Sequence, residues 1–191
     1  MANAEAVALI SVADYLADEK HAEVGHEYFT GCVVTMEGIS RRQNTIAGNL
    51  FTAIHGKLHG GPCRPFLGDL KLGIQRSNET LFYYPDIVVE CDSTAVEDDS
   101  YTTEPKVIIE VLSPTTERID RQEKFWAYAE TASLEDYVLV DHQESAVTVF
   151  RKTTDWQSEA LSSTANLVLP SIEFQMPVAQ VCIDIHFNNL A

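Results

Sequence analysis

The sequence predicts a mixed α/β fold in which helices flank a central sheet. The chain has 191 residues, which suits one domain with a substantial buried core. Its apolar share of 45% and charged share of 22% are ordinary for a soluble globular protein. Helical spacing alternates with short runs of β-branched and apolar residues, in the order helix, strand, strand, strand, helix, strand. This order indicates helices packed around one sheet.

We expect a single domain over residues 1–191, with an N-terminal helix and hairpin at about 11–38. Ser11 precedes an apolar run and is followed three residues later by Asp14, a capping-box variant that predicts a helix over residues 11–21. The segment HEYFTGCVVTM predicts a hairpin with strands on either side of Thr30-Gly31.

The central core should span about 40–152 and begin with an amphipathic helix. The stretch RRQNTIAGNLFTAIHGKL has apolar residues at steps of four, namely Ile46, Leu50, Ile54 and Leu58. After the Gly-Gly-Pro break at residues 60–62, the segments CRPFLGDLKLGI, YYPDIVVEC and PKVIIEVL predict three strands. The acidic run at residues 97–99 is expected in a solvated loop.

A second helix of this central core is predicted from Asp120 to Thr131, with a core stripe formed by Phe125, Tyr128 and Ala129. The segments DYVLVD and AVTVFRK predict a further pair of strands. The C-terminal part, at about 155–191, is expected to add one strand and a short helix.

Composition excludes several classes of protein. No stretch approaches the roughly 20 apolar residues of a membrane helix, and the N-terminus lacks the basic start of a secretion signal. The four cysteines form no CxxC pair and have no nearby histidine at zinc spacing. We therefore expect free thiols, no zinc site, no membrane partner and a cytoplasmic location.

The net charge of −16 argues against a nucleic-acid partner, because such proteins usually present a basic surface to phosphates. Any DNA-binding function must depend on a local patch or on bound cations. The densest basic cluster is at the start of the second helix, where Arg118, Arg121 and Lys124 are close in sequence.

Two carboxylates stand out by their positions in predicted strands. Glu110 interrupts the otherwise apolar run VIIEVL, where an unpaired charge would be costly, so it should be paired, protonated or bound to a cation. Asp86 follows Pro85 at the start of a strand that should neighbour the one carrying Glu110. A structural ion pair and a turn-capping aspartate are the simpler explanations. If the two converge, they suit Mg²⁺, which prefers a few carboxylates and several waters.

Lys124 is a candidate third member of this site. The spacing places it opposite the core stripe of its helix, one turn beyond Asp120. A lysine there could stabilise charge that builds on a phosphate, or it could simply be a solvated lysine paired with Asp120.

The series HEYFTG, CRPFLGDLKLGI, YYPDIVVECD, PKVIIEVLSPTTERIDRQEKFWAY and SLEDYVLVD resembles the Uma family, a domain of unknown function classed with restriction endonucleases in the PD-(D/E)xK superfamily. The resemblance covers nearly the whole chain. It implies a restriction-endonuclease-like mixed sheet with flanking helices and a nuclease core at about 40–152.

The resemblance assigns roles to individual positions. Asp86 matches the aspartate of the PD motif, and Glu110 matches the acidic residue of the (D/E)xK motif. Leu112 stands where the superfamily usually has lysine, and the family is similar in carrying that lysine on the following helix, here Lys124. Asp69 matches a recurrent acidic position and is expected as a further metal ligand. Glu27 matches an early acidic position and is expected to support the site.

One position departs from the family. Relatives often carry a histidine just before the long helix, where this chain has Gln43, which cannot shuttle protons. This difference favours a slow or inactive enzyme if the histidine is catalytic. The six histidines of this chain form no metal-like cluster in the sequence.

Three functions follow as hypotheses. The first is a Mg²⁺- or Mn²⁺-dependent endonuclease that hydrolyses DNA phosphodiesters, with Asp86, Glu110 and Lys124 as catalytic residues. Asp86, Glu110 and Asp69 would hold the metal, and the supporting residues would be Glu27, Gln43, Asp120 and Arg121. The second is a weak or inactive nuclease-fold module that binds a protein or nucleic-acid partner. The third, a two-carboxylate glycosidase, lacks a sugar-stacking aromatic cluster. A homodimer would suit an enzyme that cuts both strands.

Overall fold

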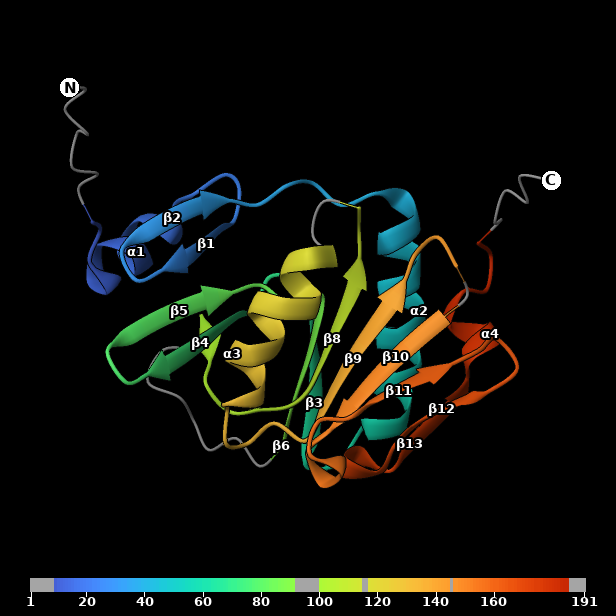
Figure 1. Ribbon diagram of the computed structural model, residues 1–191. Coiled ribbons are helices and arrows are strands. Elements are labelled where there is room, and N and C mark those ends of the chain that lie inside the picture. Colours follow the sequence, from blue (N-terminus) through green and yellow to red (C-terminus); the bar gives the residue numbers. More distant parts are fainter. Residues whose placement is uncertain (1–8, 92–99, 115–116, 145, 186–191) are drawn as a thin grey trace, which may run out of the picture.

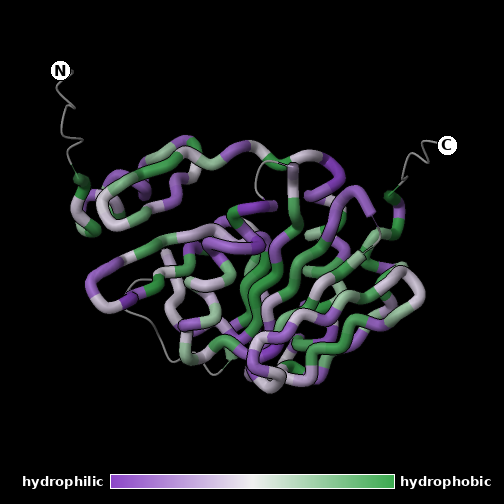
Figure 2. The backbone as a smooth tube through the Cα atoms, in the orientation of Figure 1, coloured by the Kyte–Doolittle hydropathy of each residue, from purple (hydrophilic) through white to green (hydrophobic). Residues whose placement is uncertain are grey.

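The computed structural model describes residues 9–91, 100–114, 117–144 and 146–185 (Figure 1). Its centre is a six-stranded sheet in which β8 (Pro105–Leu112) lies between β6 and β9. The other strands of this sheet are β3 (Cys63–Leu67), β6 (Ile87–Cys91), β9 (Asp136–Asp141), β10 (Ala146–Arg151) and β11 (Ser158–Leu161). The β8–β9 pair is parallel and every other pair in this sheet is antiparallel. Figure 2, in which the backbone is coloured by hydropathy, shows that the central strands of this sheet are mainly hydrophobic.

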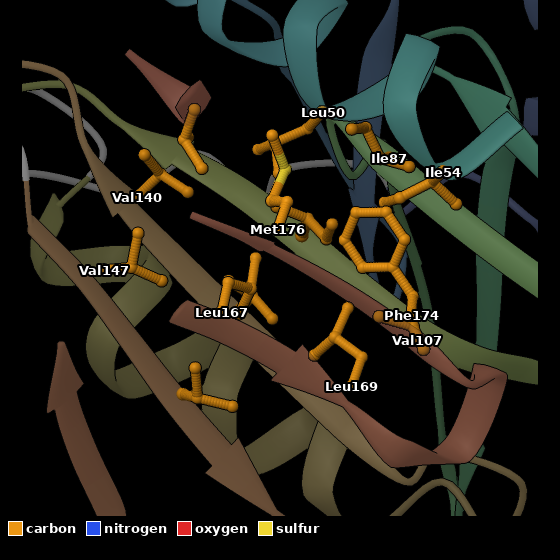
Figure 3. Close-up of a cluster of buried hydrophobic side chains, with 14 of the residues drawn as sticks. Leu50, Ile54, Ile87, Val107, Val140, Val147, Leu167, Leu169, Phe174 and Met176 are labelled. Atoms are coloured by element: carbon orange, nitrogen blue, oxygen red, sulfur yellow. The ribbon is translucent and has the colours of Figure 1, made fainter. Parts of the chain in front are cut away.

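Helix α2 (Arg41–Leu58) covers one face of this sheet. Its predicted stripe is confirmed, since Ile46, Leu50 and Ile54 are fully buried against odd-numbered residues of β6 and β8 such as Ile87 and Ile109. The same core is closed by the hairpin of β12 (Asn166–Leu169) and β13 (Phe174–Pro177) and by α4 (Val178–Val181). Figure 3 shows the hairpin side chains Leu167, Leu169, Phe174 and Met176 in this core. None of the helices that the described residues form has the length and apolar composition needed to span a bilayer.

The opposite face carries the π-helical turn η1 (Ile119–Lys124) and the short helix α3 (Phe125–Ala129) (Figure 1). Here the even-numbered residues Ile108 and Leu112 of β8 pack with Phe125 and Tyr128. The helix predicted from Asp120 to Thr131 is therefore present, but its first turn is a wider π-helical turn.

The expectation of one sheet is wrong. A second, five-stranded sheet has the order β2-β1-β5-β4-β7. Its strands are β1 (His26–Phe29), β2 (Cys32–Thr35), β4 (Lys71–Arg76), β5 (Glu79–Tyr83) and β7 (Tyr101–Thr102). The segment CRPFLGDLKLGI, expected as one strand, divides at Gly68, whose φ of +64° turns the chain out of the first sheet.

The predicted N-terminal helix and hairpin are confirmed. Helix α1 (Val12–Glu19) begins after Ser11, whose hydroxyl oxygen accepts a hydrogen bond from the Asp14 N–H at 3.1 Å. Strands β1 and β2 pair antiparallel around Thr30-Gly31, as predicted. The tail contains more strands than expected, since β11, β12 and β13 all precede α4. The acidic run at 97–99 lies outside the described residues.

The expectation of free thiols is wrong for two of the four cysteines. Cys63 and Cys91 stand directly opposite each other in the antiparallel β3–β6 pair and form a disulfide. Cys32 and Cys182 are free. The prediction of a cytoplasmic location thereby loses the free-thiol argument on which it depended.

Candidate active site

A pocket of about 470 Å³ lies where the β2–α2 connection passes the end of β8. It is formed by segments that are far apart in sequence: β1, the end of β2 with the connection to α2, the β5–β6 turn, the end of β8 and η1. Its lining residues include Glu27, Val34, Met36, Ile39, Ser40, Gln43, Tyr84, Asp86, Glu110, Asp120 and Lys124.

Asp86 and Glu110 reach this pocket from adjacent strands. Asp86 directly precedes β6, which pairs antiparallel with β8 so that Ile87 lies opposite Ile109. Because side chains alternate along a strand, the neighbours of this core-facing pair project to the opposite face, toward η1. The backbone N–H of Asp86 lies 3.4 Å from Glu110 Oε2. The sheet register therefore brings the two carboxylates together on one face.

The Asp86 side chain is held by the backbone of the neighbouring strand. Its Oδ2 accepts a hydrogen bond from the Val111 N–H at 2.6 Å, which fixes the carboxylate at the end of β8. Burial raises the pKa of Asp86 to about 6, although the Val111 N–H and the charge of Lys124 oppose this rise. Asp86 is consequently harder to ionise than an exposed aspartate.

Glu110 is more deeply buried and more strongly perturbed. Its side chain is nearly inaccessible, and burial raises its pKa well above the usual range against the opposing charge of Lys124. The Tyr128 hydroxyl donates to Glu110 Oε1 at 2.8 Å. Burial also raises the pKa of Tyr128, so that this hydroxyl remains a protonated donor.

Lys124 occupies the centre of the acidic cluster. The prediction that it faces away from the core is wrong: it is only 6% exposed, and it lies one turn before Tyr128, on the face that packs against the sheet. Its ammonium lies 3.4 Å from Glu110 Oε1 and 5.5 Å from the centre of the Tyr83 ring. Burial by itself would lower the pKa of Lys124, but the surrounding carboxylates raise it well above its usual value, and the lysine stays charged.

Two further carboxylates complete the cluster. Glu27 Oε1 extends from β1 to within 3.0 Å of Lys124 Nζ, and Asp120 Oδ1 lies 3.3 Å from the same atom, one turn earlier in η1. Asp120 is 2% exposed, and its Oδ1 has no hydrogen-bond partner of good geometry among the described residues. Glu27 thus links the second sheet to the site.

The donor set fits a hard divalent cation. The buried cluster has four carboxylates, from Glu27, Asp86, Glu110 and Asp120, around the single ammonium of Lys124. A cation would favour the ionised forms of Asp86 and Glu110, whose pKa is raised by burial. In the described parts of the chain, no group of three or more His, Cys, Asp or Glu side chains is arranged to hold a metal. Mg²⁺ takes only one or two protein carboxylates and keeps several waters, so the residues that could hold it here are Asp86 and Glu110.

Gln43 connects the first turn of α2 to β8. Its side chain accepts from the Ser40 N–H at 3.0 Å, completing a capping box, and its amide donates to the Val111 carbonyl at 3.3 Å. Gln43 thus fixes the helix against the strand that carries Glu110.

The other predicted site residues lie away from the cluster. Asp69 is exposed in the turn between β3 and β4 and is not among the residues that line the pocket. Arg121 pairs with Glu117 at 2.8 Å, and Arg118 pairs with Glu123 at 3.0 Å. These arginines are thus partly neutralised within their own segment.

The pocket wall was not predicted from the sequence. Met36 and Ile39 of the β2–α2 connection line it, as does Tyr84, which stands two residues before Asp86. The Tyr84 hydroxyl donates to Glu19 Oε1 at 2.7 Å, which anchors the ring to α1. The Ser40–Gln43 capping box could have been predicted from the motif S-x-x-Q. That motif would have placed the start of α2 directly after Ser40.

Two curated relatives match most of the chain. It is 33% identical over 184 residues to the uncharacterized protein slr1290 of Synechocystis sp., covering 95% of this chain and 93% of that protein. It is 28% identical over 151 residues to the uncharacterized protein sll1609 of the same organism, covering 78% and 84% of the two chains.

A crystal structure with a similar fold is that of a "putative nuclease belonging to DUF820" from Anabaena variabilis ATCC 29413. The TM-score is 0.75 at 19% sequence identity, covering 91% of this chain and 97% of that one. This similarity confirms the restriction-endonuclease-like fold that the resemblance implied. Residues 12–179 match the Uma2 family, whose description is "Putative restriction endonuclease", and the chain belongs to this family.

Proposed function

We propose that this protein is a metal-dependent nuclease that hydrolyses DNA phosphodiester bonds at the Asp86–Glu110 site. The observation that carries the proposal is the convergence of these two carboxylates from adjacent strands, with the Lys124 ammonium 3.4 Å from Glu110 Oε1. Membership of the Uma2 family supports the same general class of activity.

Asp86 and Glu110 would hold a Mg²⁺ or Mn²⁺ ion. When bound, such an ion supplies Lewis-acid activation of the phosphate and of an attacking water. The hydrogen bond from the Val111 N–H orients Asp86, and the Tyr128 hydroxyl orients Glu110. Both carboxylates are therefore fixed before substrate arrives, which reduces the reorganisation that catalysis requires.

Lys124 supplies positive charge beside the scissile phosphate. Glu27 and Asp120 hold its ammonium at 3.0 and 3.3 Å, so that it remains in place when Glu110 engages a cation. A positioned ammonium stabilises negative charge that builds up on the phosphate oxygens in the transition state.

A second candidate is a nuclease-fold module that binds a partner without cutting. The observation that favours it is the pairing of Arg118 and Arg121 with Glu123 and Glu117, which neutralises part of the positive charge that a phosphate backbone would require. The same cleavage assay separates the two candidates.

The test compares the parent protein with Glu110→Gln on mixed-sequence DNA in Mg²⁺ and in Mn²⁺. Glu23→Gln is the matched control, since Glu23 is exposed and outside the pocket. We expect cleavage by the parent and by Glu23→Gln, and a loss of at least about a hundredfold in Glu110→Gln. A parent protein that cuts no better than Glu110→Gln would contradict the nuclease proposal.

A further inference from the structure

We propose that the pocket accepts an unpaired DNA strand, one nucleotide at a time, and discriminates against an intact duplex. This inference rests on the proposed nuclease function and names the substrate class of the same site. It follows from the depth of the site, the chemistry of its wall and its charge.

The reacting groups lie at the bottom of the pocket. Glu110 is 4% exposed and Lys124 is 6% exposed. A phosphate that contacts both side chains must therefore enter the pocket, below the protein surface. A volume of about 470 Å³ falls within the range of roughly 300–1,000 Å³ typical of pockets that hold one small molecule, the size of a nucleotide. A strand that enters a pocket of this size must be separated from its complement, so a duplex has to open locally at a cost in pairing and stacking energy. An unpaired strand avoids that cost.

The wall of the pocket suits an exposed base. Val34 and Ile39, at the end of β2 and in the β2–α2 connection, are 52% and 54% exposed although both line the pocket. Met36 lies between them in sequence, and Tyr84 contributes an aromatic ring that its hydrogen bond to Glu19 holds in place. Apolar and aromatic side chains pack on the faces of unpaired bases irrespective of sequence. In a duplex these faces are covered by stacking.

The charge of the pocket also disfavours a duplex. Among the described residues that line it are the carboxylates of Glu27, Glu37, Asp86, Glu110 and Asp120, and the only lysine or arginine is Lys124. Duplex DNA has one negative charge per roughly 1.7 Å of axis, whereas a single strand has one per roughly 3.4 Å. Repulsion by a protein of net charge −16 is therefore weaker for the single strand.

The test uses one oligonucleotide sequence in three forms: single strand, blunt duplex, and duplex with an unpaired flap. Each is incubated with the full chain in Mn²⁺, with Glu110→Gln as the inactive reference. We expect kcat/KM for the single strand, and for the unpaired arm of the flap, to exceed that for the duplex by at least roughly tenfold, the cost of unstacking a base being a few kcal/mol.

A matched pair of variants tests the apolar wall. Ile39→Ala removes a side chain from the pocket, whereas Ile183→Ala removes one of nearly equal exposure, 53%, that does not line it. We expect Ile39→Ala to raise KM for the single strand roughly fivefold or more, as loss of apolar contact with a base predicts, with kcat little changed. Ile183→Ala should leave both constants as in the parent protein.

The outcomes separate the two proposals. Equal or faster cutting of the duplex, dependent on Glu110, would overturn the preference for unpaired strands and leave the nuclease function standing. Equal effects of Ile39→Ala and Ile183→Ala would overturn the role of the wall. Failure to cut any of the three forms would overturn the proposed nuclease function, and this inference with it.

Discussion

Replacing Lys124 tests both the stability and the chemistry of the acidic cluster. Its ammonium lies within 3.0–3.4 Å of three carboxylates, those of Glu27, Asp120 and Glu110. Removing one partner of a buried ion pair commonly costs about 3–5 kcal/mol, because the remaining charge is left without compensation. Lys124→Met keeps most of the apolar stem, so the loss measures the charge rather than the packing.

For a chain of this length, that loss corresponds to a fall in Tm of roughly 10 °C in metal-free buffer. Saturating Mn²⁺ should restore part of it, because a cation at Glu110 offsets the same negative charge. At saturating metal, kcat for DNA cleavage should fall by about a hundredfold or more, as when one preorganised electrostatic group is removed.

The assay is a thermal melt with and without Mn²⁺, followed by single-turnover cleavage on the same preparations. Lys57→Met is the control, since Lys57 is exposed on α2 and outside this pocket. If Lys124→Met melts and cuts like Lys57→Met, Lys124 contributes neither to the cluster nor to the reaction.

Three further predictions concern the support of the site. Gln43→Ala should lower the free energy of unfolding by about 1–2 kcal/mol in urea melts, because it removes the capping box and the bond to Val111; no loss would contradict this link. Cys63→Ser should cost about 2–4 kcal/mol in non-reducing urea melts while Cys32→Ser changes little; equal effects would contradict a disulfide that stabilises the fold. Since the pKa of Asp86 is raised from 3.8 to about 6, the folded state binds more protons than the unfolded state between these values. Unfolding free energy of the metal-free protein should therefore fall as pH rises through 4 to 6, by an amount on the order of 2 kcal/mol, and Asp86→Asn should flatten that slope.

Much of the central fold could be predicted because its signals are local. The steps of four in α2 and the apolar runs of β6 and β8 report directly which faces are buried. The division into two sheets could not be predicted, since it depends on the positive φ of Gly68 in a segment that otherwise has the composition of one long strand. Pairing of Cys63 with Cys91 likewise depends on the β3–β6 register, which spacing alone does not give.

The candidate site was predictable in its carboxylates but not in its surroundings. Glu110 is conspicuous as a charge in an apolar run, and Asp86 follows from the start of a neighbouring strand. The burial of Lys124 accords with its place one turn before the core residue Tyr128, a spacing that the predicted core stripe left out. Its carboxylate partner Glu27 comes from a different sheet, so no local pattern joins the two residues.

Leu112, which stands where the superfamily usually has lysine, is part of the apolar core. Leu112 is 2% exposed and packs with Phe125 and Tyr137 in the core beneath α3. A lysine at that position would bury a second ammonium in an apolar cluster. Leu112→Lys is thus expected to destabilise the protein rather than to restore activity to a Lys124 variant.

The central claim is that Asp86 and Glu110 together hold a divalent cation, and a Mn²⁺ titration followed by electron paramagnetic resonance tests it most directly. Binding removes the signal of free Mn²⁺, so the parent protein should take up about one ion per chain. Asp86→Asn and Glu110→Gln should each leave the signal of free Mn²⁺ nearly intact, whereas Glu23→Gln should bind like the parent. Uptake of Mn²⁺ by both site variants with the affinity of the parent would contradict the claim.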